Sequence, residues 1–249
     1  SSNHAPRAKA KELRYHRFLP PHYSVASFDR SLAMGTARIG AAAASTLHSL
    51  CALGVAAAYF LAQRVCVLDL VAHPAQTLRL LLVIEAPITI GVYSWLRRDT
   101  HGCSVWKAIG RGLLALPVGA AINAFGAIVL GAPVGIKYWT VTAYWSLLMS
   151  LFTFVPAACA FGPSRMDWQR ILSFSKLLDA VDYMISVPAY GAIIGAWIGA
   201  WPMPLDWERP WQEWPICVTY GAIAGYLTGM VASVVFIVAL HRKVHAKGE

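Results

Sequence analysis

Apolar residues in this chain are gathered into long blocks separated by short polar segments. Six blocks occupy residues 39–62, 78–96, 113–135, 138–160, 184–201 and 216–240. Each can cross a bilayer as a straight or tilted helix, since a spanning helix needs roughly 20 residues. The pattern predicts an all-α polytopic membrane protein, a bundle of six transmembrane helices.

The segments outside the blocks define three parts of the chain. Residues 1–38 are polar and basic, and Pro20 and Pro21 interrupt any helix there. We therefore expect a basic cytosolic arm over 1–38, a six-helix transmembrane domain over 39–243 and a short cytosolic tail over 244–249.

The distribution of Lys and Arg indicates the orientation of the bundle. With six spans, all but four of the 21 basic residues fall on the side that holds both termini; the four exceptions are Arg64, Arg79, Lys137 and Arg209. Cytosolic loops carry the excess of Lys and Arg. Both termini are thus predicted to be cytosolic, and the loops 63–77, 136–137 and 202–215 lumenal.

Composition supports a membrane protein and excludes several other classes. The chain is 57% hydrophobic and only 13% charged, whereas soluble domains carry about 25% charged residues. The net charge of +9 comes from residues at block ends, which suits anionic headgroups and gives no nucleic-acid-binding face. The five cysteines form no CxxC pair, so neither a disulfide framework nor a zinc site is expected.

Two glycine stripes mark the fifth and sixth blocks. The glycines recur every four residues, so each set lies on one face of its helix: Gly191, Gly195, Gly199, and Gly221, Gly225, Gly229. Such stripes let two helix backbones approach closely in lipid. The two helices could pack on each other as a hairpin, or a stripe could face the helix of a partner.

The segment between these two helices is rich in tryptophan and proline. It runs from Trp201 to Pro215, and its prolines stiffen it and prevent a continuous helix. Its four tryptophans suit the headgroup layer. A solvated interfacial loop and a partner-docking loop both remain open; the docking candidates are Trp207, Arg209, Trp211 and Trp214.

A few polar residues fall inside or beside the apolar blocks. Glu85 and Asn123 could line a polar or lipid-headgroup site, although hydrogen bonds between helices that include His48 are the simpler explanation. Asp179 and Asp182 precede the fifth block, where we expect them to be solvated at a helix start.

Signatures of catalysis are missing from the sequence. It has no GxxxxGK[ST] loop, HExxH or GxSxG motif, and no clustered His and Asp set. We therefore predict no catalytic residue, no bound metal and no cofactor.

One stretch of sequence carries a family resemblance. Residues 204–215, followed by the glycine-striped sixth block, are similar to the PIG-F family, as is Gly131-Ala132-Pro133. The resemblance implies a multi-pass protein of the endoplasmic reticulum membrane that acts in GPI-anchor assembly. It also implies a non-catalytic subunit that binds and stabilises a large GPI ethanolamine phosphate transferase of the PIG-O or PIG-G type, among membrane lipids.

Two other functions remain open at this point. The chain could present a lipid to such a transferase or complete its catalytic site, a hypothesis that rests on Glu85, Asn123 and the lumenal arginines. It could instead be a small lipid transporter, which would need a polar path through the bundle.

Overall fold

The structure, a computed structural model, describes residues 39–100, 102–173, 177 and 179–248. Six of its helices are long and apolar enough to cross a membrane, which confirms the predicted architecture. These helices are α3 (Ala41–Arg64), α4 (Pro74–Trp95), α5 (Val105–Val129), α6 continued by α7 (Ile136–Thr153 and Val155–Phe161), α9 (Ala180–Ala200) and α10 (Ile216–Gly248). The arm predicted for residues 1–38 lies outside the described residues.

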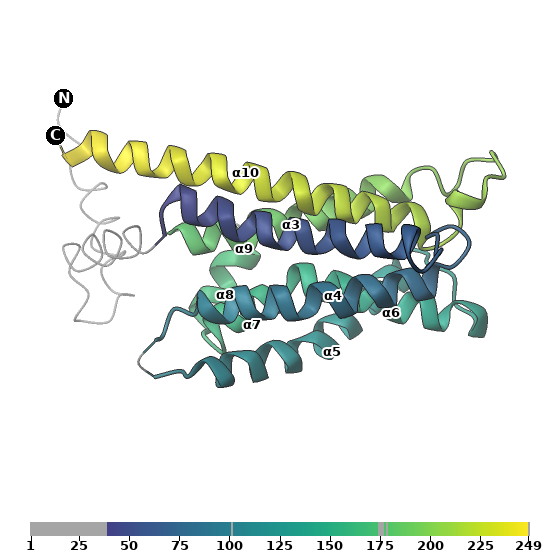
Figure 1. The fold of residues 1–249 in the computed structure, drawn as a ribbon, viewed down its shortest axis with the longest axis horizontal. Coiled ribbons are helices and arrows are strands. Elements are labelled where there is room, and N and C mark those ends of the chain that lie inside the picture. The colour runs from purple at the N-terminus through teal and green to yellow at the C-terminus, as the bar shows by residue number, and fades with distance from the viewer. Residues whose placement is uncertain (1–38, 101, 174–176, 178, 249) are drawn as a thin grey trace, which may run out of the picture. The chain divides into compact units, whose positions relative to one another are not determined.

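Two short elements lie in the connections between these helices. They are α8 (Arg165–Leu172) and the 3-10 helix η1 (Pro210–Gln212). Successive spans are antiparallel, so the α3–α4, α5–α6 and α9–α10 connections share one end of the bundle (Figure 1). The α4–α5 connection and α8 lie at the other end.

The helix boundaries differ most from the predicted blocks in α5 and α10. The third helix begins at Val105 rather than 113, because Ser104 caps it by accepting a hydrogen bond from the backbone N of Lys107 at 3.2 Å. It ends at Val129, and Gly131, with φ of 101°, turns the chain toward α6. α10 continues as a helix to Gly248, through most of the segment predicted as a tail.

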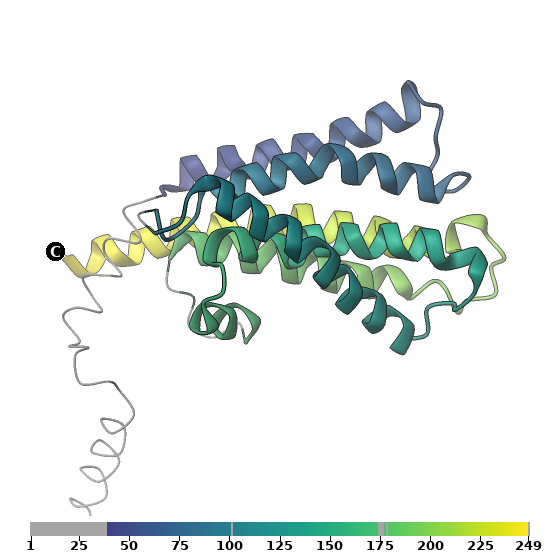
Figure 2. The ribbon, with the colours of Figure 1, turned by 90° about the horizontal axis from the view of Figure 1, so that it is seen from below.

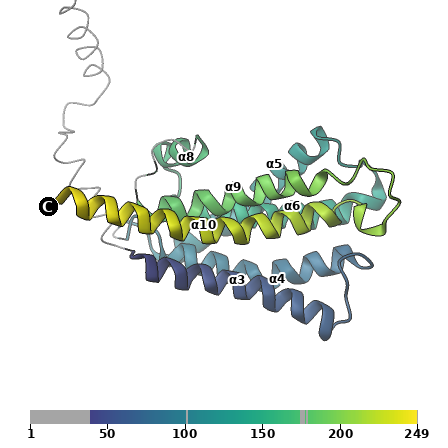
Figure 3. The same ribbon diagram turned by 90° about the horizontal axis from the view of Figure 1, so that it is seen from above.

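The continuous span α6–α7 is the centre of the bundle. In its membrane-spanning window 78% of residues are buried, against 22% for α5. The span is interrupted at Phe154, and Pro156 occupies the first turn of α7. Figure 2 shows α3 and α4 as a separate layer, and Figure 3 shows α9 and α10 side by side along their length.

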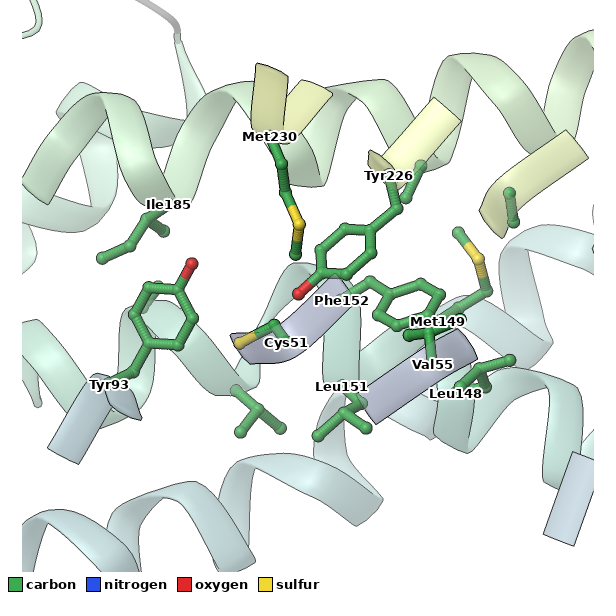
Figure 4. Packing of buried hydrophobic residues seen from close by; sticks show 14 of the residues in the cluster. Cys51, Val55, Tyr93, Leu148, Met149, Leu151, Phe152, Ile185, Tyr226 and Met230 are labelled. Carbon is green, nitrogen blue, oxygen red and sulfur yellow. The ribbon is translucent and has the colours of Figure 1, made fainter. Parts of the chain in front are cut away.

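Aromatic packing and a few hydrogen bonds join the helices in the core. The ring of Tyr226 on α10 stacks on Phe152 of α6 with centroids 4.0 Å apart, beside Cys51 of α3 (Figure 4). Tyr93 Oη on α4 donates to the carbonyl O of Met184 at 3.0 Å. These contacts fix α9 and α10 against the rest of the bundle.

Candidate functional site

The six glycines of the two stripes meet between α9 and α10, at a contact that we call the glycine seam. A Cβ added to Gly195 would overlap the carbonyl O of Gly221 and lie 2.9 Å from Gly225 Cα; a Cβ on Gly225 would overlap the carbonyl O of Gly191. The remaining two, Gly199 and Gly229, meet the backbone of Cys217 and of Pro188 in the same way. The stripes therefore face each other, and the predicted hairpin is confirmed.

The seam is stabilised by backbone contact rather than by side-chain burial. Helices in lipid gain little from the hydrophobic effect when they associate, so dispersion over closely approaching backbones provides much of the attraction. Carbonyl oxygens such as that of Gly221 lie against the Cα atoms of the opposite helix, where weak Cα–H···O contacts form. The result is a closely packed two-helix unit. Binding of a partner's helix to this unit stays a prediction.

The segment 201–215, which we call the tryptophan loop, is organised around the side chain of Gln212. Gln212 is 8% exposed. Its Nε2 donates to the carbonyl oxygens of Pro202 at 2.6 Å and Leu205 at 2.8 Å, and its Oε1 accepts from the backbone N of Arg209 at 2.9 Å. One side chain thus satisfies three backbone groups that the prolines leave outside any helix.

Gln212 was not among the residues predicted from the sequence. It is an uncharged polar residue with both a donor and an acceptor in a loop whose prolines prevent regular backbone pairing. A buried role for Gln212 could have been predicted from this combination, because the backbone groups of such a loop must obtain hydrogen bonds from side chains.

The four tryptophans of the loop have different environments. Trp201 and Trp207 are 71% and 56% exposed, and Trp211 packs edge-on to Trp207 with centroids 5.9 Å apart. Arg209 is exposed beside them. Trp214 is only 9% exposed, and its Nε1 donates to Thr142 Oγ1 at 2.9 Å. Trp214 therefore anchors the loop to α6 instead of facing outward as a docking residue. Trp207 and Arg209 are exposed, and Trp211 is half-buried against the core.

The polar residues predicted inside the spans have separate roles. His48 Nε2 and Ser233 Oγ form a hydrogen bond of 2.7 Å that joins α3 to α10, as expected. Glu85 instead accepts from Thr89 of its own helix at 2.9 Å, and its carboxyl packs on Gly54 of α3. Asn123 donates to the carbonyl O of Gly119, also within its own helix. The expectation that Glu85 and Asn123 bond between helices is wrong, and no hydrogen bond connects the two.

The aspartates before the fifth block belong to a charged cluster, which we call the ion-pair network. Its members are Arg98, Asp167, Arg170, Asp179 and Asp182. Asp182 is fully buried and accepts from Arg98 Nη2 at 2.9 Å and from Arg170 Nε at 2.9 Å. The expectation of a solvated helix start is therefore wrong. The network joins the end of α4 to α8 and to the start of α9.

Two groups in this network, Asp179 and Arg170, have pKa values above their ordinary values. Burial and the nearby charge of Asp182 raise the pKa of Asp179, although Arg98 opposes the shift. Burial alone would lower the pKa of Arg170, but its hydrogen bonds and charge interactions with Asp182 and Asp167 raise the pKa above its ordinary value. Asp179 also accepts from the backbone N of Asp182 at 3.0 Å and so caps α9.

Metal-ligating side chains are not clustered in the part of the chain that the structure describes. Among the residues that the structure describes, no three His, Cys, Asp or Glu side chains gather as a metal-binding group. The exposed features are a braced aromatic loop and, beside it, a hairpin closed by backbone contact. Together with the six helices that are long and apolar enough to cross a membrane, they describe a multi-pass membrane protein.

Comparison with known proteins identifies the family. The profile of the GPI biosynthesis protein family Pig-F matches residues 52–234, and the chain belongs to that family. No solved structure matches the chain.

Three curated relatives illustrate the similarity. A human protein named "GPI ethanolamine phosphate transferase, stabilizing subunit" is 39% identical over 110 residues, which is 44% of this chain and 50% of that protein. A Yarrowia lipolytica protein named "Glycosylphosphatidylinositol anchor biosynthesis protein 11" is 37% identical over 121 residues, or 48% of this chain and 52% of its own length. A Schizosaccharomyces pombe "PIGF/3-ketodihydrosphingosine reductase fusion protein" is 37% identical over 48% of this chain and 24% of its own length. The chain thus spans about half the length of the first two proteins.

Proposed function

We propose that this protein is the stabilising subunit of a GPI ethanolamine phosphate transferase of the PIG-O or PIG-G type. The observation that carries the proposal is the exposed, internally braced tryptophan loop, adjacent to the glycine seam, in a chain of the Pig-F family. Exposed aromatic side chains held in one conformation are typical of interface anchors, because little side-chain entropy is lost on binding.

Orientation and location are part of the same proposal. In the membrane of the endoplasmic reticulum, the excess of basic residues would place both termini in the cytosol and the tryptophan loop in the lumen. Residues 1–38 would then form a cytosolic arm. The loop would meet the transferase on the lumenal side, and the helices would meet its membrane-spanning part.

Catalysis is assigned to the partner. The alternative that this chain completes a catalytic or lipid-presenting site relied on Glu85 and Asn123. Glu85 is fully buried against α3, which argues against its contact with a partner's substrate, and the Asn123 side chain donates to the carbonyl O of Gly119 in its own helix.

The test is purification of the tagged protein from cells in mild detergent, followed by identification of the proteins that accompany it. A GPI ethanolamine phosphate transferase in stoichiometric amount is the expected result, and loss of this chain should lower the level of that transferase. Recovery of the chain alone, from extracts where such transferases stay intact, would overturn the proposal.

A substitution in the tryptophan loop gives a sharper prediction. Gln212→Ala removes three hydrogen bonds to backbone groups, a local cost of about 2–3 kcal/mol. We expect a more protease-sensitive loop and several-fold less copurified transferase, with the helices intact.

The matched control is Gln169→Ala, which removes an exposed glutamine from α8 at the other end of the bundle. It should change neither measurement. If Gln212→Ala makes the loop protease-sensitive while transferase recovery stays at the wild-type level, the loop does not carry the contact.

A further inference from the structure

The outward side of the α9–α10 hairpin is hollowed into a groove of about 530 Å³. The glycine seam forms its floor. Ile194 and Ile198 of α9 form one wall, and Ala224, Thr228 and Ala232 of α10 form the other. The seam brings the backbones together, while the side chains on either side stand above it, so the groove is a direct consequence of the glycine spacing.

The two walls of the groove differ in height. Ile194 and Ile198 are 55% and 60% exposed and rise from α9. The α10 wall consists of small residues at four-residue spacing, a second stripe beside the glycines. Thr228 Oγ1 donates to the carbonyl O of Ala224 at 2.8 Å, so this wall presents no unpaired hydroxyl donor to an apolar occupant.

We propose that this groove receives one transmembrane helix of the transferase, which presents a ridge of large apolar side chains at four-residue spacing. The proposal rests on the proposed function. The seam glycines already contact each other, so an incoming helix cannot use them for backbone contact and must fill the space above them with side chains. Ridge-into-groove packing of this kind sets the geometry of helix pairs.

Two observations favour a helix over a lipid acyl chain. The low α10 wall lets a rigid helix come close and make many contacts, a gain that a flexible chain would offset by lost entropy. The groove also continues toward the tryptophan loop, since Ile198 and Gly221 lie at the ends of α9 and α10 that the loop connects. A protein with a membrane helix and a domain on that side would contact both surfaces at once.

The length of the groove sets the extent of the contact. On α9 it runs from Val187 to Ile198, roughly 16 Å along the helix, which is about half the hydrocarbon thickness. The contact therefore involves about three turns of the partner's helix, in the half of the bundle nearer the tryptophan loop.

The experiment places a photo-reactive benzoylphenylalanine in the full-length protein, in cells that contain the transferase. The groove positions are Ile194 and Thr228; the controls are Ile193 and Val231, which are exposed on the same two helices outside the groove. We expect adducts with the transferase at both groove positions and none at the controls. Ala224→Phe, which fills the groove, should lower transferase recovery about tenfold, while Val231→Phe should leave it unchanged.

Other results would separate the two proposals. If the transferase copurifies but the groove positions label phospholipid, or a second copy of this chain, the groove is not the helix site and the proposed function stands. Equal labelling of groove and control positions, or unchanged recovery with Ala224→Phe, would likewise overturn the groove assignment. If no transferase copurifies with the wild-type chain, both proposals fail.

Discussion

Gly225→Leu is expected to break the α9–α10 hairpin. A Cβ at Gly225 overlaps the carbonyl O of Gly191 and lies 2.9 Å from Gly195 Cα, and both atoms belong to backbone that cannot rotate away. The helices must separate along the whole seam to admit the side chain. The cost is at the upper end of overpacking effects, about 3 kcal/mol or more. Denaturant titration in detergent, followed by circular dichroism, would measure the loss of unfolding free energy.

The chain offers a matched control for this substitution. Gly126 lies inside α5, where an added Cβ would meet nothing within 4 Å. Gly126→Leu should be neutral or stabilising by a few tenths of a kcal/mol, because leucine has the higher helix propensity. An equal loss in both variants would show that the loss at Gly225 does not come from the seam, because Gly126 has no neighbour for an added side chain to displace.

This expectation changes how partner-binding experiments on the seam are interpreted. A loss of transferase association with Gly225→Leu would follow from a broken hairpin whether or not the seam touches a partner. Substitutions on the groove walls, such as Ala224→Phe, leave the seam glycines in place and report on the partner directly.

The architecture was predictable because membrane-spanning helices are specified locally. A block of about 20 apolar residues needs no knowledge of its neighbours to be assigned as a span, and all six were found. The glycine spacing likewise determined which faces of α9 and α10 carry the stripes. The start of α5 was misjudged because Lys107 and Arg111 lie in its first two turns, and their basic side chains were assigned to the preceding loop.

Burial of polar and aromatic residues could not be predicted in the same way, because it depends on partners distant in sequence. Trp214 is buried because Thr142, 72 residues earlier, accepts its hydrogen bond. Asp182 is buried because Arg98, 84 residues earlier, pairs with it. A partial signal existed for the second case: Arg98 follows the second span and Asp182 precedes the fifth, so both were expected at the same membrane surface.

Arg170→Met should destabilise the protein by about 3 kcal/mol, since it removes one partner from a buried ion pair. Arg170 donates to Asp182 at 2.9 Å and 3.0 Å and to Asp167 at 2.5 Å. Its loss would leave the carboxylates of Asp167 and Asp182 without one of their positively charged partners. Adding Asp182→Asn should recover part of the loss, and a double-mutant cycle would measure the coupling. The control is Arg165→Met, an exposed arginine of α8; equal losses from the two arginines would contradict the role of the network.

Asp179→Asn should have the opposite effect at the same network. Asparagine caps a helix as well as aspartate does, so the start of α9 is retained. The pKa of Asp179 is raised in the folded protein, so its ionised form opposes folding above that raised pKa. The substitution should therefore be neutral or stabilising at neutral pH. This benefit should shrink as the pH falls through the raised pKa of the folded protein and disappear below 3.8, the ordinary pKa, where the aspartate is protonated in both states. A benefit that grows on acidification would show that Asp179 stabilises the fold as a carboxylate.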